Sequence, residues 1–184
     1  GGPWPAFRDY EPLLLLEGTA TDSQGERRAA RVQVIGAHPR PSLGVGQAPV
    51  KGSGRVLLNE RLARKLGVDP GRVFKTLLVR LDNRQLAIAV VPVSGQLNLK
   101  RMAKACSARK AAMADTGSVQ RATGYVPGGV SPLGQRRLLH TVIDATAADH
   151  ETVFVSGGRR GLDVELSPRE LCDLLDADFA DIRG

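Results

Sequence analysis

The chain has 184 residues, of which 42% are hydrophobic, and this suits one domain with a real core or one domain with an appendage. No apolar run approaches the roughly 20 residues that cross a bilayer, so a membrane-spanning protein is not expected. Cys106 and Cys172 lie outside any C-x-x-C spacing and there are only three histidines. The composition therefore supports neither a metal site nor a disulfide framework, and it favours a reducing cytoplasm.

The net charge of +7 is unevenly distributed along the chain. Residues 72–144 hold 12 Lys and Arg against 3 Asp and Glu, whereas residues 145–184 hold 4 against 9. A basic centre of this kind indicates a polyanionic partner, nucleic acid first. An ordinary solvated basic face is the alternative. Aromatic residues make up only 4%, so a base-stacking platform for single strands is not indicated.

Residues 1–58 differ in sequence pattern from the rest of the chain. Segments 13–20 and 29–35 predict two strands joined by a polar hairpin loop, and the Gly- and Pro-rich segment 36–54 predicts a linker. The motif EGT…RVQVIG in this part, followed by VLLNERLARKLGV-x-PG, resembles an extracytoplasmic segment of FtsX-like ABC-transporter permeases. That resemblance covers roughly the first 70 residues, so an N-terminal appendage or fusion is expected.

A helix is expected from Asn59, as its N-cap, to Leu66. From Gly71 onward, strands and helices interleave irregularly, which predicts an α+β fold with a mixed sheet. The expected strands are 73–81, 85–92, 141–145, 152–156 and 162–166. The expected helices are 97–106, 117–121 and 168–175, the last with Ser167 at its N-cap.

The segment 123–135, TGYVPGGVSPLGQ, predicts a shaped loop, because its four glycines and two prolines disfavour a helix or a long strand. Gly128 and Gly129 leave room for a ligand to approach main-chain N–H and C=O groups. A tight turn at a barrel corner is the alternative.

Lys75 shares one face of its expected strand with aliphatic residues only. A lysine in that position either extends to water from the strand's end or sits in a pocket that awaits an anionic or carbonyl partner. The sequence leaves both open.

Ser156 and Asp163 are expected to be cross-strand neighbours in a hairpin that turns at 159–160, which would also pair 157 with 162 and 158 with 161. A surface contact between hydroxyl and carboxylate is the alternative. No histidine has a matching place beside Ser156, so a Ser-His-Asp triad is not supported.

Several blocks occur in order from about residue 66 to the C-terminus: RVFKTLLVRLD, LAIAVVPVSGQLNLKRMAKA, KAAMAD, RATGYVPGGVSPLGQ, TVIDA and VFVSGGRRGLDVEL. Together they resemble the YbaK/EbsC family of free-standing aminoacyl-tRNA deacylases, related to the editing domain of bacterial prolyl-tRNA synthetases. The resemblance implies a barrel-like mixed sheet flanked by helices. It also implies a deacylase domain at 59–184 that follows an atypical N-terminal hairpin appendage at 1–58.

The resemblance implies removal of cysteine from mischarged Cys-tRNA(Pro), by a hydrolase or lyase type of reaction. No metal, cofactor or protein nucleophile is implied, because the substrate's own thiol or the terminal hydroxyl of the tRNA takes part. Lys75 stands at the place of the essential lysine. The substrate-binding positions carried over with it are Thr76, Gly128, Gly129, Ser156 and Asp163.

The implied partner is tRNA(Pro) in the cytoplasm, with prolyl-tRNA synthetase as a candidate second partner and no membrane. Arg136 and Arg137, just after the glycine-rich loop, are the leading phosphate contacts. The family's usual N-terminal elements, which supply an aromatic wall and a tyrosine to the pocket, are missing or replaced by the hairpin. A tRNA-binding module that has lost catalysis is therefore the alternative function.

Overall fold

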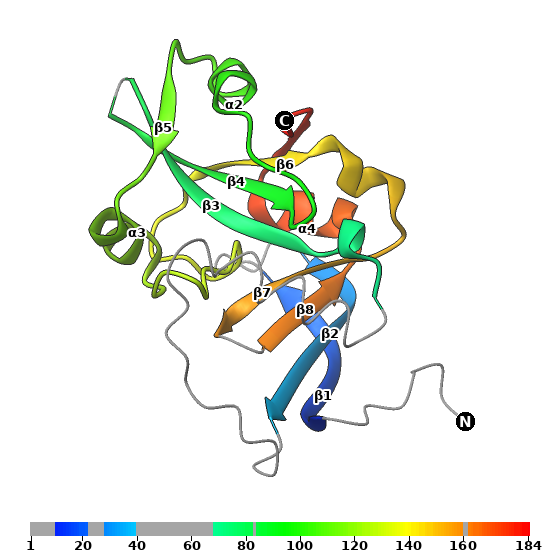
Figure 1. Cartoon of the computed structure of the whole chain (residues 1–184). Helices are drawn as coiled ribbons and strands as arrows, with labels where there is room; N and C mark the ends of the chain where they lie inside the picture. Colours follow the sequence, from blue (N-terminus) through cyan, green and yellow to red (C-terminus); the bar gives the residue numbers. More distant parts are fainter. Residues whose placement is uncertain (1–9, 22–27, 40–67, 83, 160–161) are drawn as a thin grey trace.

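The computed structural model describes residues 10–21, 28–39, 68–82, 84–159 and 162–184, and it contains two sheets (Figure 1). The first sheet has five strands in the order β5-β3-β4-β6-β9. Their bounds are β3 Phe74–Leu81, β4 Leu86–Pro92, β5 Ala111–Met113, β6 His140–Asp144 and β9 Asp178–Ala180. β3 is antiparallel to β4 and β5, whereas β6 is parallel to β4 and β9, so this sheet is mixed.

The second sheet is antiparallel and has the order β1-β2-β8-β7. Its strands are β1 Tyr10–Thr21, β2 Arg28–Pro39, β7 Val153–Arg159 and β8 Leu162–Leu166. A parallel bridge between Val73 and Phe154 joins the two sheets where β3 begins. The N-terminal hairpin is thus hydrogen-bonded, through β2 and β8, to the strand that carries Asp163.

Three α-helices surround the first sheet within the described residues: α2 Leu99–Ala105, α3 Thr116–Thr123 and α4 Pro168–Leu175. Two short 3-10 helices, η1 Pro70–Arg72 and η2 Ala145–Asp149, complete the elements. The side chains of Asn98 and Asp115 cap α2 and α3 by accepting backbone N–H groups. Ser167 stands at the N-cap of α4, as expected, but its side chain makes no capping hydrogen bond.

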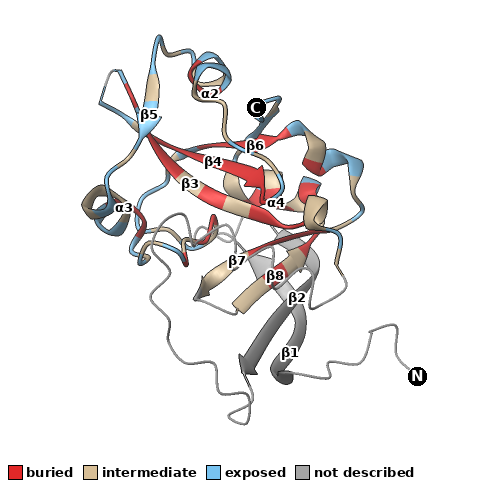
Figure 2. Ribbon diagram, viewed as in Figure 1, coloured by how far each residue is buried: buried red, intermediate tan, exposed pale blue. Residues whose placement is uncertain are grey.

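The core lies on both faces of the central strand β4, which is why its sequence is almost continuously apolar. One face packs with α4 and with β7 and β8, around Phe74, Ile88 and Leu171. The other face packs under α2, around Met102 and Ile182. Figure 2 shows buried residues concentrated along β3, β4 and β6, so the strand that carries Lys75 is anchored from both sides.

The expected α+β class and mixed sheet are confirmed, and so are the strands expected at 13–20 and 29–35. The sheet is open and does not close into a barrel, because its edge strands β5 and β9 have only three residues each and do not pair with each other. The hairpin loop at 22–26, most of the linker and the helix from Asn59 to Leu66 lie outside the described residues. Among those residues, no helix has the length and apolar character needed to cross a membrane.

The register of the β7–β8 hairpin differs from the expected one beyond its first pair. Ser156 lies opposite Asp163 as expected, but Leu162 pairs with Arg159 rather than with Gly157. The register shifts at Gly157–Gly158, where Gly158 adopts a φ of 94° that favours glycine. The expected turn at 159–160 is therefore wrong, since Arg159 still belongs to the ladder.

Candidate active site

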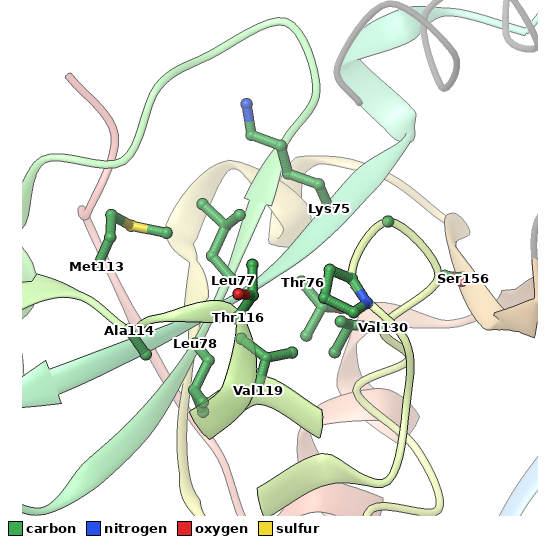
Figure 3. A pocket seen from close by; sticks show the side chains of 12 residues that line it. Lys75, Thr76, Leu77, Leu78, Met113, Ala114, Thr116, Val119, Val130 and Ser156 are labelled. Atoms are coloured by element: carbon green, nitrogen blue, oxygen red, sulfur yellow. The ribbon is translucent and has the colours of Figure 1, made fainter. Parts of the chain in front are cut away.

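A pocket of about 140 Å³ lies against one edge of β3 (Figure 3). Its walls come from β3, the end of β5, α3, the glycine-rich loop and β7. The lining residues are Lys75, Thr76, Leu77, Leu78, Met113, Ala114, Thr116, Val119, Pro127, Gly128, Val130 and Ser156. The pocket thus joins an apolar wall to a few polar groups, which is the usual composition of a small-molecule site.

The pocket occupies a gap in the pairing of β3. β7 bridges the start of β3 at Val73, and β5 pairs only from Val79 onward. The carbonyl of Leu78 accepts from Ala114 N at 3.0 Å on this edge. Because main-chain groups alternate along an antiparallel strand, the N–H and C=O of Thr76 face the same edge, toward the pocket. An open strand edge can bind an amide-like or ester-like group.

Lys75 is half-buried and lines this pocket. Its Nζ donates to the carbonyl oxygen of Gly95 at 2.6 Å. The loop around Gly95 is fixed by the C-terminal segment, since Gly184 N donates to Gln96 O and Asn98 N donates to Ile182 O. The ammonium group is therefore held by a loop that is itself hydrogen-bonded to the C-terminal segment.

Thr76 lines the same pocket and is 9% exposed. Its Oγ1 is the one buried side-chain polar atom without a hydrogen-bond partner in the described part of the chain. A buried hydroxyl without a partner lowers stability, and such atoms are found where a ligand supplies the missing bond.

We expect Thr76→Val to raise the free energy of unfolding by about 1 kcal/mol, because valine has the same shape and removes the unpaired hydroxyl. Thr141→Val is the matched control: Thr141 is also buried, but its hydroxyl donates to Leu139 O at 3.0 Å. In Thr141→Val the free energy of unfolding should fall by about 1 kcal/mol. Urea unfolding of both variants measures the difference, and equal destabilisation would contradict the unpaired state of Thr76.

The glycine-rich loop contributes Pro127, Gly128 and Val130 to the pocket wall. Gly128 has a φ of 95°, which side-chain-bearing residues rarely adopt, and it is exposed at the pocket surface. Gly129 is buried, its N–H donates to Val126 O at 3.1 Å, and it does not line the pocket. Of the two glycines expected to contact substrate, only Gly128 is thus in position to do so directly.

Ser156 reaches the pocket from β7, and its Oγ accepts from Gly158 N at 3.3 Å. Asp163, its cross-strand partner, stands behind it on β8 and is not a lining residue. Burial raises the pKa of the Asp163 carboxyl to about 6. The structure therefore brings Ser156 to the pocket and leaves Asp163 one strand away.

The raised pKa of Asp163 predicts a pH-dependent stability. The folded protein holds this proton up to about pH 6, whereas the carboxyl's ordinary value is 3.8. The contribution of the protonated Asp163 carboxyl to the free energy of unfolding is thus complete below pH 3.8 and is lost as the pH rises through 6. We expect Asp163→Asn to become more stable than the parent protein by up to about 3 kcal/mol as the pH rises from 4 to 7. Asp149→Asn, at an exposed site, is the control; parallel curves for all three proteins would contradict the buried carboxyl.

Several pocket residues were not identified by sequence reasoning, chiefly Met113, Thr116 and Val119. Met113 ends β5, while the other two lie on α3, and Figure 3 shows them around the pocket with Lys75. Their only sequence signal was the block KAAMAD, whose Asp115 caps α3 by accepting Ser118 N at 2.8 Å. That cap fixes where the helix starts and so brings Thr116 to the pocket.

Arg136 and Arg137 are both exposed and neither lines the pocket. The side chain of Arg136 lies over Gly124 so closely that a Cβ there would be 3.0 Å from its Cγ and Nε. Its main-chain N–H donates to Thr123 O at 3.3 Å. Arg136 is therefore packed at the C-terminal end of α3.

Among the described residues, no group of three His, Cys, Asp or Glu could hold a metal ion.

The model of the aminoacyl-tRNA editing domain family matches residues 57–174, well over half of the chain. The chain belongs to this family. The chain is 35% identical, over 67% of its own length and 75% of the relative's, to EbsC of Enterococcus faecalis, named "Putative Cys-tRNA(Pro)/Cys-tRNA(Cys) deacylase". YwhH of Bacillus subtilis is 29% identical over 62% of this chain and 72% of that protein. The resemblance to the YbaK/EbsC family is thus confirmed.

Solved structures agree with the fold of this editing domain. The protein APE2540 superposes with a TM-score of 0.68 and 26% identity, over 84% of this chain and 93% of that one. A protein described as a "putative trans-editing enzyme for prolyl tRNA synthetase" superposes with a TM-score of 0.65 and 22% identity, over 73% and 85% of the two chains. The similarity to FtsX-like permeases stays a prediction, since the family model begins only at residue 57.

Proposed function

We propose that this editing domain deacylates mischarged tRNA, with Cys-tRNA(Pro) as its substrate. The observation that carries the proposal is that Lys75, Thr76, Gly128 and Ser156, from three separate parts of the chain, line one small pocket. The family membership and the name of the Enterococcus faecalis relative support the substrate class. A pocket of about 140 Å³ suits the aminoacyl end of tRNA, with the rest of the nucleic acid lying outside.

In this proposal the pocket acts by positioning and electrostatics. The Lys75 ammonium lies beside the ester and stabilises the negative charge that develops on its carbonyl oxygen. The open edge at Thr76 and the main chain at Gly128 bind the α-amino group and the terminal ribose, while Ser156 contacts the substrate from β7. Holding the ester in one orientation converts its attack by a nearby group into an effectively intramolecular step.

The attacking group in this proposal belongs to the substrate. The cysteine sulfur attacks its own ester carbonyl carbon, the ester C–O bond breaks, and the thiol proton passes to the departing ribose oxygen. The products are tRNA and a cyclic thioester of cysteine, which water then opens to free cysteine. The alternative route uses the neighbouring ribose hydroxyl to orient a water molecule, which hydrolyses the ester directly. Serine in place of cysteine separates the two routes, because it lacks the thiol.

The tRNA body in this proposal lies across the basic part of the surface. Arg136 and Arg137 are exposed, follow directly on the pocket loop and are suited to contact phosphates without reading sequence. We infer a cytoplasmic location, where charged tRNA is found, and prolyl-tRNA synthetase as a second partner. We also infer a deacylase domain at 59–184 that follows an appendage at 1–58, of which the described strand β2 pairs with β8.

The test is to incubate the purified protein with tRNA(Pro) carrying cysteine, serine, alanine or proline and to follow loss of each aminoacyl bond. The expected result is fastest release from Cys-tRNA(Pro), slower release of the other small residues and none of proline. Release of every amino acid at its spontaneous rate would contradict the proposal. If tRNA is still bound with a steep salt dependence, the protein is a binding module.

A further inference from the structure

Tyr125 joins the two ends of the glycine-rich loop. Its hydroxyl donates to Leu133 O at 2.7 Å, with Gly134 O at 3.4 Å. Its main-chain N–H donates to Thr123 Oγ1 at 3.1 Å, and that hydroxyl in turn donates to Val119 O at 2.7 Å. The side chain of Tyr125 therefore fixes the loop that holds Pro127, Gly128 and Val130, and its main-chain N–H ties the loop to α3.

The ring of Tyr125 also contacts the opposite wall of the pocket. It lies against Gly158 so closely that a Cβ at that glycine would be 2.6 Å from the ring's Cε1. Gly158 belongs to the bulge of β7, and its N–H donates to Ser156 Oγ at 3.3 Å. Glycine is thus required at position 158 for two reasons: its φ is 94°, and the close approach of the ring leaves no room for a Cβ.

The two elements that Tyr125 joins are opposite walls of one pocket, with Gly128 on the loop and Ser156 on β7. We propose that Tyr125 is a positioning and specificity-determining residue that fixes the spacing of these walls. The inference rests on the proposed deacylation, because it assigns the size limit of the aminoacyl group to this spacing. A wider or more mobile gap accepts larger amino acids and holds cysteine less well.

The test compares Tyr125→Phe with Thr141→Val, which also removes a hydroxyl that donates to a backbone carbonyl, that of Leu139, at a residue that does not line the pocket. Tyr125→Phe keeps the ring against Gly158 and removes only the bond to the loop. We expect the ratio of kcat/KM for Cys-tRNA(Pro) to that for tRNA(Pro) carrying methionine, a larger amino acid, to fall by about two- to tenfold, the range that one neutral hydrogen bond supports. Thr141→Val should leave the ratio unchanged. Loss of thermal stability with an unchanged ratio would show a merely structural role.

A second measurement separates this inference from the proposed function. Hydrogen exchange of the parent protein and of Tyr125→Ala, which removes the hydroxyl and the ring together, should show faster exchange both in the 126–134 loop and at 156–158 on β7, because the two walls are fixed through one side chain. This result is expected whether or not the protein deacylates tRNA. Exchange that increases in the loop alone, or in neither segment, would overturn the positioning role even if cysteine release is observed.

Discussion

Lys75→Ala is expected to lower the single-turnover rate of cysteine release from Cys-tRNA(Pro) by about 100- to 1000-fold, the effect of removing one preorganised charge or donor from a transition state. Lys75 lines the pocket and its Nζ is held at 2.6 Å from Gly95 O, so in the proposed reaction its charge needs no rearrangement when substrate binds. Removing the side chain leaves the ester carbonyl facing the apolar side of the pocket.

The same variant should stay folded, because Lys75 is only half-buried and water can replace its bond to Gly95. Lys100→Ala, an exposed lysine on α2, is the control and should keep the parent rate. The affinity for uncharged tRNA, measured in parallel, should be nearly equal in all three proteins. An unchanged rate in Lys75→Ala, or an equal loss in Lys100→Ala, would remove Lys75 from the reaction.

Asp144→Ala is expected to lower the free energy of unfolding by about 2–4 kcal/mol. Asp144 is 1% exposed, and its carboxylate accepts from Thr146 N at 3.2 Å, from Thr146 Oγ1 at 2.5 Å and from the buried Ile182 N at 3.1 Å. Alanine removes the cap of η2 and leaves a buried donor unpaired, which together account for that range. Urea unfolding followed by circular dichroism measures it.

The effect of Asp144→Ala should extend to the pocket. Ile182 O accepts from Asn98 N at 2.8 Å, so the C-terminal segment that Asp144 holds also fixes the loop around Gly95 and, through it, Lys75. We therefore expect slower cysteine release as well. Asp149→Ala, at the exposed end of η2, should change neither quantity. Equal stabilities of the two variants would show that the Ile182 bond contributes little.

The elements of the fold were largely predictable because their patterns are strong. The continuous apolar run of β4 and the alternation in β3 gave both strands within a residue or two. Whether the five-stranded sheet closes into a barrel was not predictable, since closure depends on how far the short edge strands β5 and β9 pair. The hairpin register was missed for a local reason: a bulge at Gly157–Gly158 adds residues that no alternation pattern reveals.

The site was predictable where a residue breaks a pattern and not where it follows one. Lys75 is a charge on an aliphatic face, and Gly128 belongs to a segment too rich in glycine for regular structure. Val119 and Met113 look like ordinary apolar residues, and only the gap between β7 and β5 along β3 turns them into pocket walls. The contact of Tyr125 with Gly158 joins residues 33 positions apart and depends on the same bulge.

The central claim is that this editing domain releases cysteine from Cys-tRNA(Pro). Its most direct test is a single-turnover experiment with the protein in excess over Cys-tRNA(Pro), in which the aminoacyl bond and tRNA binding are followed together. The expected result is release of cysteine well above the rate without protein, with Pro-tRNA(Pro) left intact. Binding of Cys-tRNA(Pro) with release only at the rate seen without protein would contradict the claim and identify a binding module.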